Sequence, residues 1–269
     1  MPDPLGDFDP TTTYDEAVLE YESASGDFWR HLSDHTVELL ALQRGERVLD
    51  LPCGTGHVAL GAAERVGPDG RVVALDVSER MTQLVSHKAA QLQLTNVDVG
   101  VADMTRLGRP DPPFDAVACV LGIFFAPDMP AALRSLAAQA RPGGRIAVAV
   151  FGEEFFEPMR TTFVDAVRAV APDLQVVEPW ARVRTEQQLR ELFDAADLTA
   201  DVETCVDEVP LTSADDWWRI VMGSGLRATV GHLDPATAAG VRDRCAEEVE
   251  RHGLTALRVT SRYGVAAAA

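Results

Sequence analysis

Short apolar runs alternate along the chain with longer segments in which apolar residues recur at helical spacing. The runs around residues 48–51, 71–77, 97–101, 116–121 and 146–151 predict strands. The segments 55–66, 81–92 and 133–140 between them predict helices. Alternating strands and helices indicate parallel strands with right-handed crossovers. We therefore expect an α/β fold whose ligands gather at the carboxyl ends of the strands.

The stretch VLDLPCGTGHVAL, residues 48–60, carries the clearest chemical pattern. Its strand ends near Asp50 and turns through Gly54 and Gly56 into an alanine-rich helix. Glycines let a backbone approach a ligand closely, and the first amides of the helix offer hydrogen bonds there. Asp76 ends the next strand twenty positions after Gly56. A nucleotide-binding α/β unit places at that point the carboxylate that holds a ribose diol.

Together with three later stretches, this pattern resembles class I S-adenosylmethionine-dependent methyltransferases over about residues 45 to 152. Ala102-Asp103-Met104 is similar to the family's adenine-contacting acidic motif, residues 114–117 open the fourth strand, and the RPGGR turn at 141–145 leads into the fifth. One departure is Pro52, which stands at the family's first turn glycine. Proline has no amide proton, so the turn must be satisfied without that donor.

The resemblance implies a Rossmann-like methyltransferase fold with a seven-stranded, mostly parallel sheet in which only the last strand runs against the others. It also implies S-adenosylmethionine as cofactor and S-adenosylhomocysteine as product. The cofactor residues that it implies are Asp50, Pro52, Gly54, Gly56, Asp76, Met81, Ala102, Asp103, Met104, Val120 and Tyr21. No metal site is expected, and core packing is the alternative for Met81.

We expect a single methyltransferase domain over 1–269, with an N-terminal helical cap at 1–44 and a cofactor-binding core at 45–152. The cap is predicted as one helix over about Tyr14 to Ser23 and a second that Asp27 caps after Gly26. His35 belongs to the apolar face of that second helix, so packing is favoured for it over catalysis. Two insertions, roughly 153–182 and 211–253, are expected to form a lid with the cap, and the alanine-rich end is expected to fray.

The lid regions concentrate aromatic residues, as a pocket for a small, largely apolar acceptor requires. The expected substrate pocket consists of Phe124, Phe155, Phe156, Trp217 and Trp218. Adjacent residues on a helix point in different directions, so at most one of the two tryptophans faces the ligand, and packing of both is the alternative. Core packing is also the alternative for Phe124. An oxygen acceptor would gain from a base within hydrogen-bond reach. His31, His232 and Glu154 are the weak candidates for it, and a structural role is favoured for each, so the catalytic residue is left open.

Composition limits the kinds of binding partner and the cellular compartment that we expect. The net charge is −18, with 24 basic against 42 acidic residues and no basic run, which argues against a nucleic-acid substrate. The four cysteines are scattered without metal-ligand spacing and read as reduced thiols. Without a signal peptide or a long apolar run, we expect a cytoplasmic protein with no membrane partner. Its partner is a small molecule, and a homodimer is left open.

The favoured function is methyl transfer to a small-molecule acceptor, a secondary metabolite. The alternatives are a quinone-type C-methyltransferase of central metabolism and a non-catalytic S-adenosylmethionine-binding protein, whose cofactor motifs would look the same. A dehydrogenase of the same topology would need a third glycine where Ala59 stands, and it leaves Asp103 and the RPGGR turn without a role.

Overall fold

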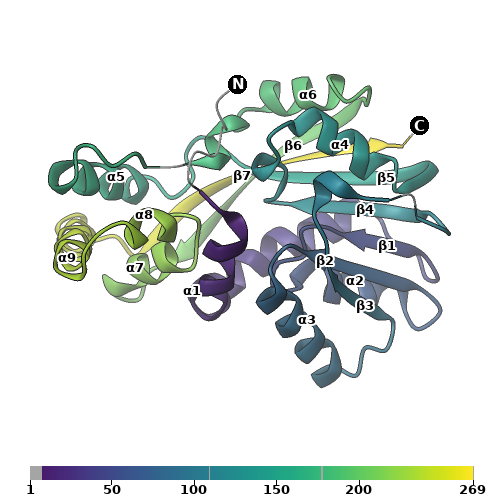
Figure 1. The fold of residues 1–269 in the computed structure, drawn as a ribbon, viewed down its shortest axis with the longest axis horizontal. Coiled ribbons are helices and arrows are strands. Elements are labelled where there is room, and N and C mark those ends of the chain that lie inside the picture. Colours follow the sequence, from purple (N-terminus) through teal and green to yellow (C-terminus); the bar gives the residue numbers. More distant parts are fainter. Residues whose placement is uncertain (1–7, 109, 177, 269) are drawn as a thin grey trace.

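A computed structural model describes residues 8–108, 110–176 and 178–268 of the chain, which fold around one seven-stranded sheet (Figure 1). The strands are β1 Arg47–Asp50, β2 Arg71–Asp76, β3 Val97–Val101, β4 Phe114–Val120, β5 Ala140–Phe151, β6 Ala200–Pro210 and β7 Ala256–Ala267. Their order is β3-β2-β1-β4-β5-β7-β6. Only β7 runs antiparallel to its neighbours, as the sequence predicts.

The central strands are buried on both faces, which explains their near-continuous apolar sequences. In β4, Val117 and Cys119 point to one apolar cluster, whereas Ala116 and Ala118 point to the other. This alternation follows from the two-residue repeat of a strand. Small alanines leave room on the second face for α2, whose Ala59, Ala62 and Ala63 are buried there.

Helices connect the strands and cover both faces of the sheet. They are α1 Pro10–Leu39, α2 His57–Val66, α3 Glu79–Gln91, α4 Met129–Ala137, α5 Met159–Val170, α6 Glu186–Asp194, α7 Asp215–Met222, α8 Arg227–Gly231 and α9 Pro235–His252. A capping box begins α6, because Thr185 and Gln188 satisfy each other's backbone amides. Helix α7 ends before Gly223, and Asp234 caps the start of α9 at Pro235.

The prediction of two N-terminal helices is wrong, because α1 is one 30-residue helix whose backbone continues through Gly26. The side chain of Asp27 lies outside the described residues. Asp9 caps the helix instead, accepting hydrogen bonds from the amides of Thr11 and Thr12 at 3.1 and 3.3 Å. An internal glycine costs a helix only about 1 kcal/mol, and α1 recovers this through buried residues at both ends, among them Ala17 and Leu32.

One smaller prediction also fails. The chain does not fray at its alanine-rich end, because β7 continues to Ala267 and the amide of Ala268 donates to the carbonyl of Gly144 at 2.7 Å. This difference comes from backbone hydrogen bonds that the side-chain pattern does not specify. Helix α7 begins at Asp215, and the amide of Ser213 just before it donates to the Asp216 carboxylate at 2.7 Å.

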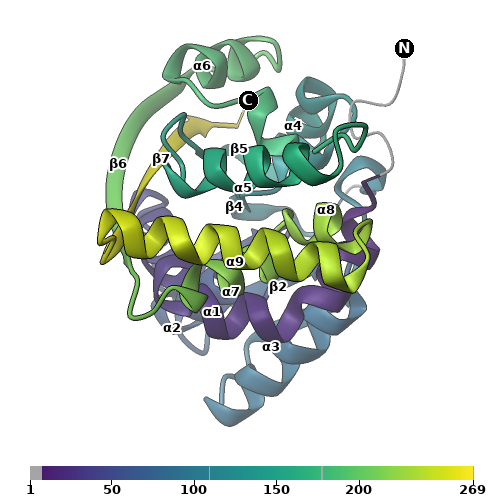
Figure 2. The same cartoon turned by 90° about the vertical axis from the view of Figure 1, so that its left-hand side faces the viewer.

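The segments that follow β5 and β6 gather beside α1. Figure 2 shows α9 lying across this side of the molecule between α5 and α1, with α7 behind it. Fully buried aromatic side chains hold this group together, and Phe156 meets Trp217 edge to face at 5.9 Å. Among the described helices, none combines the length and the apolar character needed to cross a bilayer.

Candidate functional site

A cavity of about 410 Å³ opens at the carboxyl ends of β1, β2 and β4, within the size range of small-molecule sites. It lies where the strand order reverses between β1 and β4, the point at which open α/β sheets bind ligands. Of the residues implied for the cofactor, the cavity lining includes Asp50, Pro52, Gly54, Asp76, Met81, Ala102, Asp103, Met104, Val120 and Tyr21. Motifs that are separated in the sequence thus lie close together around one cavity.

The glycine turn after β1 is built around two left-handed residues, Gly54 (φ +49°) and Gly56 (φ +89°). A side-chain carbon on Gly56 would lie 2.9 Å from Val85 Cγ2 of α3, so this glycine serves close packing of α2 on α3. Gly56 is the one implied cofactor residue outside the cavity lining. Pro52 faces Gly122 of the loop after β4, where any larger residue would overlap the proline ring.

Asp76 connects the turn to the neighbouring strand. Its carboxylate accepts hydrogen bonds from the amides of Gly54 and Ser78, both at 2.9 Å. The amide of Cys53 donates to the carbonyl of Leu75 at 2.8 Å. The turn is therefore satisfied without the amide that Pro52 lacks, and Asp76 both shapes the turn and faces the cavity.

Two buried carboxyl groups dominate the electrostatics of the cavity. Asp50 is fully buried, and within the described part of the chain neither of its oxygens has a hydrogen-bond partner. Burial, together with the charge of Asp76, raises the pKa of Asp50 well above its usual range. Burial likewise raises the pKa of Asp76, against the hydrogen bonds from Ser78 and Gly54. Such an unpartnered acid is complementary to a ligand that brings hydrogen-bond donors and positive charge.

Helix α1 closes this cavity from above with Tyr14 and Tyr21. Their rings meet edge to face at 6.2 Å, and Tyr21 stacks on Trp29 at 4.9 Å. Burial raises the pKa of both hydroxyls, so they stay protonated and act as hydrogen-bond donors at neutral pH. An ion pair fixes the helix there, because Glu22 accepts from Lys88 Nζ at 2.8 Å while Lys88 also donates to the carbonyl of Thr55 in the glycine turn at 2.9 Å.

The rim of the cavity carries the acidic motif after β3. Asp103 is partly exposed and accepts a hydrogen bond from the amide of Thr105 at 2.8 Å, which caps a short 3₁₀ turn, Met104–Arg106. Ala102, Asp103 and Met104 all lie in the cavity wall. A carboxylate beside an apolar wall suits the exocyclic amine and the flat face of a purine.

The opposite end of the cavity is aromatic and lies under the segment after β5. Phe155 stacks on Phe151 of that strand at 3.9 Å and meets Trp180 edge to face at 5.7 Å. Phe124 and Phe125, from the loop after β4, complete the wall. Arg182 holds this loop by donating to the carbonyls of Phe124 and Ala126 at 2.9 and 2.7 Å.

Three residues expected in the substrate pocket lie elsewhere. Phe156 and Trp217 are fully buried against each other, and Trp218 packs on Phe163 at 6.5 Å. None of the three lines the cavity. We expected one of the two tryptophans to face the ligand. In the structure both instead pack against phenylalanine rings outside the cavity.

The weak catalytic candidates do not line the cavity either. His31 lines a separate cavity, His232 is exposed, and Glu154 is exposed with its carboxylate 3.7 Å from Arg258. Within the described ranges, the titratable side chains in the cofactor cavity come from the motifs, the tyrosines, and three further residues: Cys53, His57 and Arg106. The structure thus brings no expected base to the cavity.

Sequence reasoning missed several lining residues, namely Pro10, Thr11, Trp29, Leu32, Ser33, His57, Phe151, Trp180, Ser224 and Gly225. His57 directly follows the glycine turn, so its position was readable from the sequence. Trp29 and Trp180 were visible as large aromatics in the cap and the first insertion. Which aromatic residue faces the ligand depends on helix rotation and on long-range packing, which no local pattern encodes.

Known methyltransferases match part of the chain. Residues 48–144 match the family model of a methyltransferase domain. The chain is 34% identical over 133 residues to nocamycin O-methyltransferase of Saccharothrix syringae, covering 49% of this chain and 48% of that enzyme. It is 35% identical over 119 residues to demethylmenaquinone methyltransferase of Listeria monocytogenes, covering 44% and 49%. The matches thus span about half the length of these relatives.

Solved structures share the fold. A SAM-dependent methyltransferase from Aquifex aeolicus superposes with a TM-score of 0.54 at 16% identity, covering 88% of this chain and 89% of that one. At this identity the likeness concerns the fold alone. The matched domain, the sheet order and the converging motifs agree: residues 48–144 match a methyltransferase domain, set in a fold that S-adenosylmethionine-dependent methyltransferases share.

Proposed function

We propose that this protein transfers the methyl group of S-adenosylmethionine to a small, largely apolar acceptor. The observation that carries the proposal is one continuous cavity with two chemically different ends. Buried carboxyl groups and protonated tyrosines occupy one end, and stacked aromatic rings occupy the other.

The acidic end suits the cofactor. Asp50 supplies unpartnered oxygens for a cationic group, Asp76 lies where a ribose diol would be held, and Asp103 lies at an apolar wall suited to adenine. A sulfonium between the two ends would face aromatic rings, which attract cations. When bound, the cofactor supplies an electrophilic methyl group, and the protein residues hold and shield it.

The aromatic end suits a flat acceptor. Phe155, Phe151 and Trp180 offer ring faces and edges, and the cavity is enclosed by α1 and the loop after β4. Because methyl transfer is an in-line displacement, alignment of the partners and exclusion of water supply much of the acceleration. This mechanism does not require a dedicated base when the acceptor ionises easily.

The acceptor that we propose is a hydroxylated secondary metabolite, in line with the relative that methylates oxygen in nocamycin. The second candidate is a quinone precursor, in line with the demethylmenaquinone enzymes, which match at similar identity. Both matches cover about half of the chain, so they support methyl transfer more strongly than they distinguish the acceptor.

The test is an acceptor screen with methyl-labelled S-adenosylmethionine, containing demethylated quinones and hydroxylated aromatic and polyketide compounds. We expect label in a hydroxylated compound, with S-adenosylhomocysteine formed in equal amount. Label only in a quinone would favour the second candidate. Tight cofactor binding without transfer to any compound would contradict the proposal and support a non-catalytic binding protein.

A further inference from the structure

A second group of polar side chains lies between α1 and the edge strand β6, outside the cofactor cavity. On α1 they are four residues at helical spacing, and on β6 they alternate along one face. The residues are His31, Asp34, His35 and Glu38 on the helix, and Glu203, Cys205 and Asp207 on the strand. Most of them, together with Tyr263 of β7, line a cavity of about 280 Å³.

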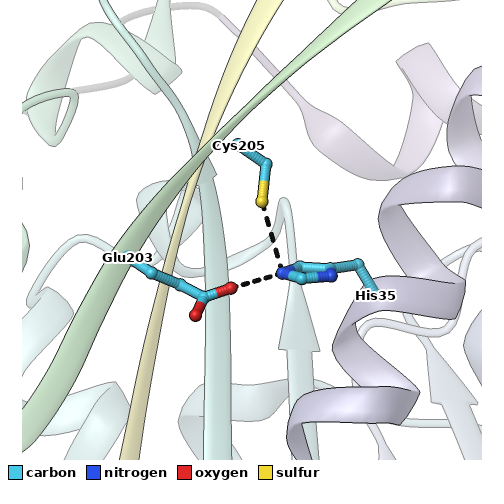
Figure 3. Close-up of side chains that lie close together, drawn as sticks. All are labelled: His35, Glu203 and Cys205. Carbon is cyan, nitrogen blue, oxygen red and sulfur yellow. Dashed lines mark hydrogen bonds and ion pairs between the residues drawn. The ribbon is translucent and has the colours of Figure 1, made fainter.

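Three of these side chains converge on one point. His35 points from α1 toward β6, where Glu203 and Cys205 point back at it (Figure 3). His35 Nε2 contacts a carboxylate oxygen of Glu203 and lies 3.3 Å from Cys205 Sγ. One ligand atom from each residue lies within 4.8 Å of the other two. Around a tetrahedral zinc ion, a bound nitrogen and sulfur lie about 3.5 Å apart, so the observed separation needs little change.

We propose that His35, Glu203 and Cys205 bind one divalent transition-metal ion of the zinc type. A histidine nitrogen, a carboxylate oxygen and a thiolate sulfur are the three donor types that zinc accepts in proteins. Hard cations such as magnesium take oxygen donors instead and do not suit this set. The fourth position is left for water, because the site opens into a solvent-connected cavity.

The surrounding charges favour a cation. Burial and the negative charges of Glu203 and Asp207 raise the pKa of the Cys205 thiol. The same field that keeps the thiol protonated attracts a positive ion, and metal binding then displaces the proton from sulfur.

The rest of the environment orients the proposed ligands. A carboxylate oxygen of Glu38 lies 3.9 Å from His35 Nδ1, on the side of the ring that carries the proton when Nε2 binds a metal. The ring of Tyr263 meets His35 edge to face at 4.6 Å and limits its rotation. Tyr263 is buried and lines this cavity, so its hydroxyl can donate a hydrogen bond to a metal-bound water.

Such an ion would connect the helix over the cofactor to the edge of the sheet. The N-terminal half of α1 places Tyr14 and Tyr21 in the cofactor cavity, while His35 lies about one turn before the end of the same helix. A metal at His35 would thus fix α1 on β6 and stabilise the closed cap. The site lies outside the cofactor cavity and does not depend on the acceptor.

The experiment is a titration of the reduced, metal-free full chain with Co²⁺, followed by competition with Zn²⁺. We expect one equivalent of Co²⁺ to bind with a near-ultraviolet thiolate-to-cobalt charge-transfer band, which Zn²⁺ abolishes. Cys205→Ser should remove the band, and His35→Ala should weaken zinc binding by more than about 100-fold, beyond what loss of an outer-shell partner costs. Zinc should also raise Tm of the wild type, but not that of Cys205→Ser or His35→Ala.

Matched controls are Cys245→Ser and the exposed His232→Ala, which should keep the band and the affinity. Glu203→Gln, whose side chain is about half exposed, tests the site if Cys205→Ser does not fold, and it should also weaken zinc binding. A missing band, a band that survives in Cys205→Ser, or equal weak binding by every variant would overturn the proposal and leave a simple His35–Glu203 ion pair.

Discussion

Single residues in the cofactor cavity serve two purposes, and Asp76 shows this most clearly. Its carboxylate accepts the amides of Gly54 and Ser78 while also facing the cavity. The expectation from sequence alone is that replacement affects only the ligand. The structure adds a cost to the turn itself, because two buried amides lose their acceptor.

We therefore predict that Asp76→Ala weakens S-adenosylhomocysteine binding by about 1.5–3 kcal/mol, the usual loss when a charged hydrogen-bond partner is removed. Isothermal titration calorimetry measures the affinity, and thermal unfolding reports the additional loss of stability. Asp69→Ala, at an exposed turn, serves as control. Unchanged affinity in Asp76→Ala would show that the carboxylate only ends a strand.

Replacing Asp50 should raise the stability of the protein, whereas replacing Asp76 should lower it. Burial raises its pKa in the folded state, so ionisation at neutral pH costs folding free energy. We predict that Asp50→Asn raises the free energy of unfolding of the ligand-free protein by about 0.5–2 kcal/mol near pH 7.5, while cofactor affinity falls.

The direction of this stability change can be tested by varying the pH. A raised folded-state pKa means that the wild type loses stability relative to Asp50→Asn as pH rises above about 4, the unfolded value of an aspartate. Urea unfolding at about pH 4 and pH 7.5 measures the difference, which should be larger at the higher pH. A difference that shrinks with pH, or an asparagine variant that binds the cofactor normally, would contradict the role of a buried, ligand-directed charge.

At the level of elements, the core strands were readable from the sequence and the antiparallel last strand from the family resemblance, but the order of the strands in the sheet and the path of α1 were not. Parallel core strands are recognised in a sequence as short apolar runs, and glycine turns mark their ends. The continuity of α1 through Gly26 depends on packing along its whole length, which outweighs the local preference to break. The His35–Cys205 contact joins residues 170 positions apart, so no spacing rule could find it.

The ion pair between Glu22 of α1 and Lys88 of α3 predicts how stability changes at acidic pH. Burial would raise the pKa of Glu22, but hydrogen bonds from His57 and Lys88 outweigh it and hold the pKa at about 2. A depressed pKa contributes stability above the unfolded value, and this is lost as pH falls from about 4.5 toward 2. Wild type should therefore lose stability in this window relative to Glu22→Gln.

At neutral pH the same Glu22→Gln change should cost up to about 1 kcal/mol, because the pair is partly exposed and solvent screens it. Glu64→Gln, on the exposed side of α2, is the matched control and should change neither value. Chemical unfolding across pH 2.5 to 7 measures both effects. A parallel loss of stability in wild type and Glu22→Gln over this acid range would exclude the ion pair as its source.

The helices after β5 and β6 carry a separate prediction. Trp217 is fully buried against Phe156, so Trp217→Ala should lower the free energy of unfolding by about 3–5 kcal/mol. Trp218 is only partly buried, and Trp218→Ala should cost clearly less. Because neither indole lines the cavity, both folded variants should keep the wild-type KM for the acceptor. A changed KM in Trp218→Ala would return that residue to the acceptor site.

For the whole molecule, the cavity collects segments that lie far apart in the sequence. The core strands supply the acidic end, α1 supplies the tyrosines, and the segments after β5 and β6 supply Phe155, Trp180, Ser224 and Gly225. The two ends should therefore be separable by mutation, since the cofactor and the acceptor contact different parts of the chain.

Phe155 provides the test of this separation. It is buried at the aromatic end and stacks on Phe151, so Phe155→Leu keeps an apolar side chain but removes a ring face from the acceptor wall. We predict about a tenfold or greater fall in kcat/KM for the acceptor, within the range set by changes of pocket shape. S-adenosylhomocysteine affinity should stay within about twofold, a difference of about 0.4 kcal/mol.

Phe163→Leu, an equally buried change in α5 outside the cavity, controls for lost packing and should leave kcat/KM unchanged. Equal kinetic losses in the two variants would mean that stability, and not contact with the acceptor, sets the rate.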